Sequence, residues 1–357
     1  MKKKILFVIS TLDPGGAEIQ LVRILQNLNY SNYDVSLYLL SKNQKLKEGI
    51  PKEVVVKTLI VRKSLFGFLR DFIKLQTSIN QLSPDVIHSS LLLSNLLVRP
   101  YKILNKKTII LNHVHGQGNW VPKIIRIIDS KTAVFVDKFI FVSQFSAELR
   151  MKREKYPSRK VNVLYNAIDT QSLTGITNNK RDKLVFGTLS RLTEVKKLKR
   201  SIDIVKFLIG KGIDSRLLIA GQGEEKEKLS YYVNSLNLEN IVEFIGFQSD
   251  LHAYFSKINI LLSTSEREDL PINLIEGLAA GKPLIATNVG GVSEILIDSV
   301  CGLLINPNIS EQDFQSIYEY VINIDFKEAE TINKEIGISN FSIKNYMEKL
   351  DNLYNVK

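Results

Sequence analysis

Short apolar segments with little polar interruption recur along the whole chain. Segments such as ILFVIS (5–10) and LVFGTL (184–189) are rich in β-branched residues, and stretches with helical periodicity separate them. Such runs are typical of strands that are buried on both faces of a parallel sheet, and their alternation with helices indicates an α/β fold. The expected strands are 5–10, 35–40, 54–56, 85–88, 108–113, 139–143 and 161–165 in the first half, and 184–189, 216–220, 241–246, 258–263, 283–287 and 302–305 in the second.

A polar stretch at residues 170–182 marks a change of character between the two halves. It contains a glycine and two adjacent asparagines, which favour a linker. We therefore predict two doubly wound, Rossmann-like α/β domains at 1–170 and 183–338, a linker at 171–182 and a C-terminal helix within 339–357. A chain of 357 residues is long enough for two such domains. Ligands of doubly wound sheets bind outside the carboxyl ends of the strands, so we expect a site in a cleft that the domains face.

Composition excludes several classes of protein. An apolar fraction of 44% and a charged fraction of 24% are those of a globular chain. The single cysteine, Cys301, excludes a disulfide framework and a cysteine-based zinc cluster. No apolar run reaches the roughly 18–20 residues that a membrane-spanning helix needs. The start of the chain, MKKKILFVIS, lacks a small-residue cleavage site, so we expect a buried strand in a cytoplasmic protein.

Charge is distributed unevenly between the halves. Residues 1–180 contain 28 Lys and Arg against 12 Asp and Glu, a net charge of +16, and residues 181–357 contain 20 against 25, a net charge of −5. A basic half is compatible with binding to nucleic acid, with an anionic membrane surface, or with a solvated basic face. Nucleic acid is the least favoured partner, because aromatic and basic residues do not interleave.

Residues 61–80 have the pattern of a basic amphipathic helix. Its apolar residues near one face are Leu65, Phe68, Leu69, Phe72 and Ile73, with a possible exposed aromatic at Phe66 and basic flanks at Arg62, Lys63, Arg70 and Lys74. The pattern fits a helix on a membrane surface, or a helix that packs on the core with basic rims. A second basic run, residues 150–160, lacks an apolar face, and we expect a solvated helix end and loop there.

The segment 263–287, STSEREDLPINLIEGLAAGKPLIAT, carries the strongest chemical signal. It places Glu268 in the loop after a strand and Glu276 inside the next helix, which we expect to start near Pro271. The two carboxylates and the helix N-terminus then face one small volume. Because carboxylates accept hydrogen bonds from sugar hydroxyls and helix N–H groups bind phosphate, the segment predicts a site for a sugar and a phosphate.

Two cations follow the expected strand at 184–189, at the same end of the sheet. Arg191 offers forked hydrogen bonds and Lys196 a compact charge, and both suit a pyrophosphate group. The alternative is a pair of solvated cations at a strand end.

Glycines follow two of the expected strands. Gly15 and Gly16 separate the first strand from a helix and would let the backbone approach an anion. Gly221 and Gly223 follow the strand at 216–220, but the residues after them do not complete the G-x-G-x-x-G pattern of a dinucleotide site.

Four histidines are present: His88, His113, His115 and His252. His113 and His115 lie two residues apart at the end of a strand and share a face. No third ligand is evident nearby and the chain lacks an Asp-x-Asp motif, so we expect no metal site. One histidine that acts beside the reacting carbon is the better functional interpretation, whereas His88 and His252 are expected to be structural.

Together these segments resemble glycosyltransferase family 4, the retaining transferases of GT-B fold that use nucleotide sugars. The resemblance covers nearly the whole chain and rests on motifs in a fixed order. They are Gly15-Gly16-Ala17-Glu18, Pro84-Asp85-Val86-Ile87-His88, Asn166-Ala167-Ile168-Asp169, Arg191-Leu192 with Lys196, Gly221 with Gly223, Glu243-Phe244-Ile245-Gly246-Phe247, Glu268 with Glu276, and Gly290-Gly291 with Glu294. The chain departs from the family pattern at Ala167 and Asp269, where glycine is usual.

The resemblance implies a role for each part of the chain. The first domain would bind the acceptor, the second would bind the nucleotide sugar, and the last helix, 341–354, would cross back to the first domain. Arg191 and Lys196 would neutralise the diphosphate, and Glu276 would hold the ribose hydroxyls. The other donor-binding residues would be Gly16, Gly246, Leu270 and Ile272, and the acceptor-side residues Gly15 and Trp120. Glu268, which would hold the donor sugar, and His115 are the expected catalytic residues, with His113 as the alternative histidine.

The implied reaction is retaining transfer of a hexose without a metal or another cofactor. The donor would be a UDP-sugar, and the acceptor a lipid-linked or other glycan in bacterial surface polysaccharide assembly. We expect a cytoplasmic protein, peripherally bound at the inner face of the cytoplasmic membrane through its basic domain, without nucleic acid. Two alternatives share the architecture: a non-catalytic accessory subunit that binds nucleotide sugars, and a nucleotide-sugar 2-epimerase.

Overall fold

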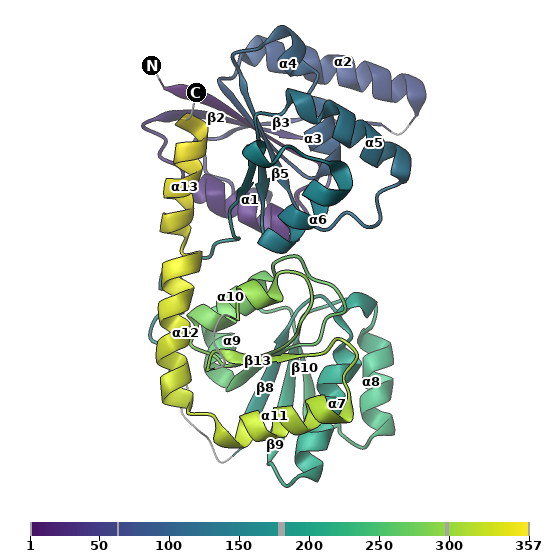
Figure 1. The fold of residues 1–357 in the computed structure, drawn as a ribbon, viewed down its shortest axis with the longest axis vertical. Helices are drawn as coiled ribbons and strands as arrows, with labels where there is room; N and C mark the ends of the chain where they lie inside the picture. Colours follow the sequence, from purple (N-terminus) through teal and green to yellow (C-terminus); the bar gives the residue numbers. More distant parts are fainter. Residues whose placement is uncertain (1, 63, 178–182, 297–299, 356–357) are drawn as a thin grey trace. The chain divides into compact units, whose positions relative to one another are not determined.

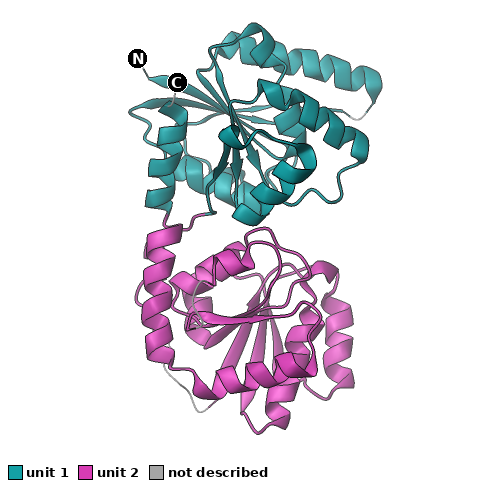
Figure 2. Cartoon of the chain, viewed as in Figure 1, with its two compact units in different colours: residues 1–166, 343–357 teal, residues 167–342 magenta. Residues whose placement is uncertain are grey.

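The computed structural model describes residues 2–62, 64–177, 183–296 and 300–355. Contacts within the chain divide it into two compact units (Figure 2). Unit 1 comprises Met1–Asn166 and Ile343–Lys357, and unit 2 comprises Ala167–Ser342. Each unit is built around one parallel sheet flanked by helices (Figure 1), which confirms the predicted class of two doubly wound α/β domains.

The sheet of unit 1 has seven strands in the order β3-β2-β1-β4-β5-β6-β7, and all its pairs are parallel. Strand β1 lies between β2 and β4, with Ile5 opposite Val35 on one side and Val86 on the other. The strands are β1 (Lys3–Ile9), β2 (Tyr33–Leu39), β3 (Val55–Thr58), β4 (Val86–Ser90), β5 (Ile109–Val114), β6 (Lys138–Phe141) and β7 (Val161–Val163).

The helices of unit 1 come from both ends of the chain. They are α1 (Gly16–Asn27), α2 (Leu65–Leu82), α3 (Leu92–Val98), α4 (Tyr101–Leu104), α5 (Lys123–Thr132), α6 (Gln144–Glu154) and α13 (Ile343–Asn355). Helix α13 packs against α1, and Lys3 Nζ donates a hydrogen bond to the carbonyl of Tyr354. Residues from the C-terminal part of the chain therefore complete the unit that the N-terminal part begins.

The sheet of unit 2 has six parallel strands in the order β10-β9-β8-β11-β12-β13. They are β8 (Leu184–Leu189), β9 (Ser215–Ala220), β10 (Val242–Gly246), β11 (Ile260–Ser263), β12 (Leu284–Thr287) and β13 (Gly302–Ile305). The helices are α7 (Leu198–Gly210), α8 (Lys226–Ser235), α9 (Leu251–Lys257), α10 (Ile272–Ala279), α11 (Glu311–Asn323) and α12 (Phe326–Phe341). In both units every predicted strand is present, and its ends differ from the prediction by no more than two residues.

The first residues of the predicted linker pack within unit 2. Leu173 and Ile176 are buried, and the carbonyl of Thr174 lies 3.1 Å from Nε2 of the exposed His252. The remainder of the predicted linker, 178–182, lies outside the described residues. The chain passes back into unit 1 between Ser342 and Ile343.

Helix α2 divides its apolar residues between the core and the solvent. Phe68 and Phe72 pack against the core of unit 1, whereas Leu65, Leu69 and Ile73 are exposed. Phe66 is 87% exposed. Lys63, one of the predicted basic flanks, lies outside the described residues. No described helix is both long enough and apolar enough to cross a membrane.

Candidate functional site

The predicted donor-binding residues of unit 2 gather at the carboxyl ends of its strands. Arg191 follows β8, and Lys196 ends the 3₁₀ turn Glu194–Lys196 just beyond it. Gly246 ends β10, Glu268 and Leu270 follow β11, and Ile272 and Glu276 lie on α10. Because the strands are parallel, these positions share one edge of the sheet.

Lys196 and Glu268 are joined directly at this edge. Lys196 Nζ lies 2.6 Å from Glu268 Oε1, and both side chains are mostly buried. Ser265 Oγ donates a second hydrogen bond, of 2.6 Å, to the same carboxylate oxygen. The ion pair joins Lys196, which we predicted to bind a diphosphate, to Glu268, which we predicted to bind a sugar.

Backbone hydrogen bonds tie the loop after β11 to the loops beside it. The N–H of Glu266 donates to the carbonyl of Val195, in the loop after β8, at 2.8 Å. The N–H of Gly291, after β12, donates to the carbonyl of Asp269 at 2.8 Å. The loop that carries Glu268 is therefore fixed on both sides.

The Gly221–Gly223 turn has a structural role that the sequence did not reveal. A Cβ on Gly221 would lie 1.8 Å from the carbonyl oxygen of Ser190, and one on Gly223 would lie 2.3 Å from that of Leu192. The φ angle of Gly221, +135°, also favours glycine. The N–H of Leu192 donates to the carbonyl of Gln222 at 2.9 Å. The turn thus supports the loop that carries the exposed Arg191.

Helix α10 begins where the sequence predicts. Pro271 is its N-cap residue, and the helix runs from Ile272 to Ala279. Leu270 and Glu276 are buried, and Ile272 is partly buried. A buried carboxylate at this edge suits a group that accepts hydrogen bonds from a bound ligand.

In unit 1, the Gly15-Gly16 turn joins β1 to α1. Gly16 is the first residue of α1 and is exposed, and Gly15 is its N-cap residue. A Cβ on Gly15 would lie 2.5 Å from the carboxylate of the buried Glu18, so glycine leaves room for that side chain to fold back over the turn.

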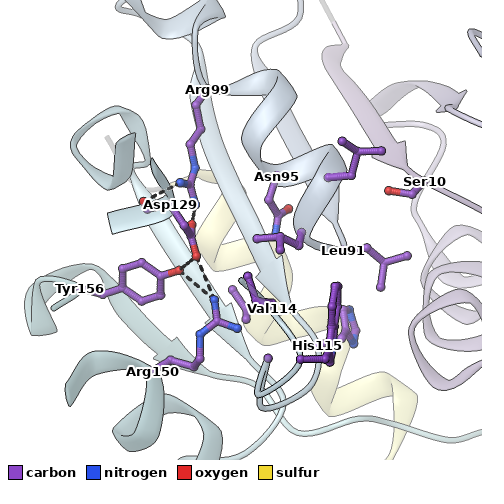
Figure 3. A pocket seen from close by; sticks show the side chains of 14 residues that line it. Ser10, Leu91, Asn95, Arg99, Val114, His115, Asp129, Arg150 and Tyr156 are labelled. Carbon is purple, nitrogen blue, oxygen red and sulfur yellow. Dashed lines mark hydrogen bonds and ion pairs between the residues drawn. The ribbon is translucent and has the colours of Figure 1, made fainter. Parts of the chain in front are cut away.

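A cavity of about 280 Å³ lies beside the carboxyl ends of β1, β4 and β5 in unit 1 (Figure 3). His115 and Trp120 both line it, Trp120 being 77% exposed. Leu91, Leu92, Leu93, Val114 and Val121 supply most of the apolar lining. His113 is buried and is not among the lining residues, so His115 is the histidine that meets this cavity.

A network of buried charges forms the other side of the cavity (Figure 3). Asp129 on α5 pairs with Arg99 Nη2 at 2.8 Å and with Arg150 Nη2 at 2.9 Å. Arg150 Nε also pairs with Glu154 at 3.0 Å, and the Tyr156 hydroxyl donates a short hydrogen bond to Asp129. The prediction of a solvated helix end at 150–160 is therefore wrong for Arg150 and Glu154, because charges from α5 and the end of α3 enclose them.

The same network holds the loop between β5 and α5. Arg153, paired with Glu154 at 2.8 Å, donates to the carbonyl of Gln117 at 2.6 Å and to Asn119 Oδ1 at 2.9 Å. This loop carries His115 and Trp120. Sequence reasoning missed the network because its members come from separate helices, and the one available signal was Asp129 in an otherwise apolar and basic helix.

Burial keeps the histidines of this region neutral. It lowers the pKa of His115 to about 4. Burial, with a smaller contribution from His115, lowers the pKa of His88 to about 3. The imidazole of His115 is therefore uncharged near pH 7. Among the described residues, no group of three or more His, Cys, Asp or Glu side chains is arranged to hold a metal ion.

Comparison with known proteins agrees with the class that the fold and these residues define, namely a two-unit α/β transferase. The family model "Glycosyltransferase Family 4" matches residues 14–172, and "Glycosyl transferases group 1" matches residues 169–336. The two matches overlap at residues 169–172 and together cover residues 14–336, which include every strand of both sheets except β1. The chain is a glycosyltransferase of the family 4 type, with the GT-B fold.

Relatives of this kind are similar along most of the chain. An uncharacterized glycosyltransferase of Haemophilus influenzae is 24% identical, over 87% of this chain and 88% of its own. The O-antigen biosynthesis glycosyltransferase WclY of Escherichia coli is 24% identical, over 84% and 83%. The crystal structure of Anabaena Alr3699/HepE in complex with UDP is 20% identical, covers 99% of both chains and has a TM-score of 0.82.

Proposed function

We propose that this glycosyltransferase moves a sugar, with retention, from a UDP-sugar to a lipid-linked or other glycan in bacterial surface polysaccharide assembly. The observation that carries the proposal is the Lys196–Glu268 pair at the carboxyl edge of the unit 2 sheet, beside the loop of Arg191. The UDP complex of HepE supports uracil as the base, and the O-antigen role of WclY supports a surface glycan as the product.

The donor would bind to unit 2. Arg191 and Lys196 would meet the negative charge of the diphosphate, which a guanidinium fork and an ammonium both suit. Glu268 and Glu276 would accept hydrogen bonds from the sugar and the ribose. Two cations next to the leaving group would stabilise the charge that develops on it, so we infer that the reaction needs no metal.

The acceptor would bind to unit 1 at the cavity of His115 and Trp120. An acceptor hydroxyl would form a bond to the anomeric carbon while the bond from that carbon to the diphosphate breaks. The hydroxyl proton would pass to the departing diphosphate oxygen, on the same face of the sugar. His115, neutral near pH 7, would form a hydrogen bond to the bound sugar close to its anomeric carbon. The indole of Trp120 would offer the acceptor an exposed apolar face.

The experiment is calorimetric titration with UDP, GDP and ADP. We expect UDP to bind tightly to the wild-type chain and at least about tenfold more weakly to Arg191→Ala, because charge-assisted hydrogen bonds each contribute about 1.5–3 kcal/mol. The matched control is Arg216→Ala. Arg216 is also an arginine of unit 2, but it lies near the amino end of β9 and pairs with Glu243.

Binding of no diphosphate would overturn the donor site. UDP binding without sugar transfer to any glycan acceptor would favour the accessory subunit. Release of UDP with an isomerised sugar in the absence of an acceptor would favour the epimerase.

We also propose that unit 1 binds an anionic membrane surface through α2 and α5. Helix α5 exposes Ile124, Ile127 and Ile128, between the exposed cations Lys123 and Lys131. The crossovers β3–α2–β4 and β5–α5–β6 run in the same direction across the sheet, so the right-handed rule places both helices on one face. Such a location would place the enzyme at the inner face of the cytoplasmic membrane.

Sedimentation with vesicles tests the membrane proposal. At low salt, vesicles with about one third anionic lipid should retain the chain better than neutral vesicles, since each cation near the headgroups contributes about 1 kcal/mol. Phe66→Ser should weaken binding on the order of tenfold, by removing one exposed aromatic ring that the membrane would bury. The control is Tyr231→Ser, which removes a 79% exposed aromatic of unit 2. Equal retention by both kinds of vesicle would contradict the proposal.

A further inference from the structure

A chain of four aromatic side chains connects the C-terminal helix to His115. Tyr354 on α13 places its hydroxyl 2.7 Å from Nδ1 of His88, on β4. His88 Nε2 lies 3.3 Å from Nδ1 of His113, on β5. The ring of His113 packs on that of His115, with 4.1 Å between the ring centroids. Tyr354, His88 and His113 are almost completely buried.

The hydrogen bonds of this chain are consistent with donation that begins at Tyr354. Burial raises the pKa of Tyr354 well above its usual value of 10, so the hydroxyl keeps its proton. Within the described residues His88 Nδ1 is its only hydrogen-bond partner, and Tyr354 therefore donates to it. A neutral His88 that accepts at Nδ1 carries its proton on Nε2 and donates to His113. Since His113 then accepts at Nδ1, its own proton lies on Nε2, a buried nitrogen with no hydrogen-bond partner among the described residues.

The direction of these bonds fixes His113 in two respects. The bond a histidine makes through one ring nitrogen decides which nitrogen carries the proton, and it also holds the plane of the ring. The backbone of the same residue is held by Asn95, whose Nδ2 donates to the His113 carbonyl at 3.1 Å. His115, which lines the cavity, packs on a ring whose position and protonated nitrogen are both set by a residue of the neighbouring strand β4.

We propose that Tyr354 is a positioning residue for His115 and acts through His88 and His113. This inference rests on the proposed function, because His115 is assigned there to the reacting centre. The hydroxyl of Tyr354, on a helix 239 positions later in the chain, thereby sets the surroundings of His115. Loss of the hydroxyl should impair transfer while leaving the donor site in unit 2 intact.

The first test does not depend on activity. Long-range proton–nitrogen NMR of the full chain labelled with ¹⁵N-histidine reads which ring nitrogen is protonated. We expect both His88 and His113 to carry the proton on Nε2 in the wild-type chain. In Tyr354→Phe, the His88 signals should change to those of the other tautomer or of a mixture, and those of His113 should follow. Protonation of His113 on Nδ1 in the wild-type chain, or identical spectra of the two chains, would overturn the proposal.

The second test separates positioning from stability. Tyr354→Phe should lower kcat about tenfold or more, as small misplacements in active sites do, with unchanged binding of UDP. The control is Tyr346→Phe, which removes the same atom from a buried tyrosine of the same helix that has no ring contact with the three histidines. His88→Gln, a second variant, should reproduce the loss of kcat if it folds.

The outcomes distinguish this inference from the proposed function. The positioning role would be overturned if Tyr354→Phe and Tyr346→Phe lost kcat equally, each in proportion to the decrease in its melting temperature. Absence of transfer by the wild-type chain with every donor and acceptor would overturn the proposed function, and the NMR measurement would still decide the direction of the hydrogen bonds.

Discussion

Lys196 Nζ and Glu268 Oε1 are 2.6 Å apart at the edge of the unit 2 sheet. A diphosphate bound at Lys196 would bring negative charge next to the carboxylate of Glu268. The lysine attracts both groups, and the two anions repel each other. Each of the two residues would therefore influence how the other interacts with a bound diphosphate.

This relationship predicts opposite effects of two substitutions on UDP binding. Lys196→Ala should weaken binding at least about tenfold, because it removes a charge-assisted contact and the cation that offsets the negative charge of Glu268. Glu268→Gln should leave UDP binding unchanged or a few times tighter, because it removes an anion from beside the diphosphate, while sugar transfer falls about a hundredfold or more. Calorimetry and a transfer assay measure the two effects. Weaker UDP binding in both variants would show that Glu268 supports the diphosphate site instead.

The Gly221 turn predicts a loss of donor binding without loss of the fold. A Cβ at this position would meet the Ser190 carbonyl at 1.8 Å, and the loop of Arg191 would have to move. We expect Gly221→Ala to weaken UDP binding at least about tenfold, with the circular dichroism spectrum retained. Gly210→Ala is the control, because that glycine lies on α7 and a Cβ there meets nothing within 4 Å. Similar UDP affinity in the two variants would contradict the proposed role of the turn.

The buried charge network predicts a large loss of stability when one member is removed. Asp129→Ala would leave Arg99 and Arg150 buried without their shared carboxylate. Breaking a buried pair in this way costs about 3–5 kcal/mol. Glu243→Ala, which breaks the exposed pair with Arg216, should cost no more than about 1 kcal/mol. Urea unfolding measures both free energies, and a loss below about 1 kcal/mol for Asp129→Ala would show that water enters to replace the carboxylate.

The buried histidines predict a loss of stability in acid. Burial lowers the folded-state pKa of both His88 and His113 below the value of 6.5 for an exposed histidine. Below pH 6.5 the unfolded chain therefore binds more protons than the folded one, so stability decreases as the pH falls. Each group contributes up to about 1.4 kcal/mol per pH unit, and nothing further is gained from them well above pH 7.

Urea unfolding at pH 7.5, 6.5 and 5.5 measures this slope. Replacement of one buried histidine, as in His88→Gln, should make the decrease between pH 6.5 and 5.5 shallower. The matched replacement His252→Gln, of an exposed histidine, should leave the slope as in the wild-type chain. An unchanged slope in His88→Gln would mean that acid acts through other groups.

The fold could be predicted from the sequence to a large extent, because strands buried on both faces leave a nearly continuous apolar signal. The predicted donor-side residues of unit 2 could be placed at one edge because they lie at the carboxyl ends of strands in one parallel sheet. The contacts within each site could not be predicted. The sequence predicts a solvated Arg150 within a basic run, because its partner Asp129 belongs to another helix. The bond between Tyr354 and His88 joins residues 266 positions apart, and no local pattern signals it.

The discontinuity of unit 1 has a consequence for how the chain folds as it is made. Residues 167–342 form a compact unit by themselves and leave the ribosome before α13 does. Unit 2 can therefore fold before residues 343–355 leave the ribosome. Until then, the surface of unit 1 that α13 covers beside α1 remains exposed. The surroundings of His115 reach their final form in that last step, so a nascent chain acquires a folded unit 2 before it acquires a finished unit 1.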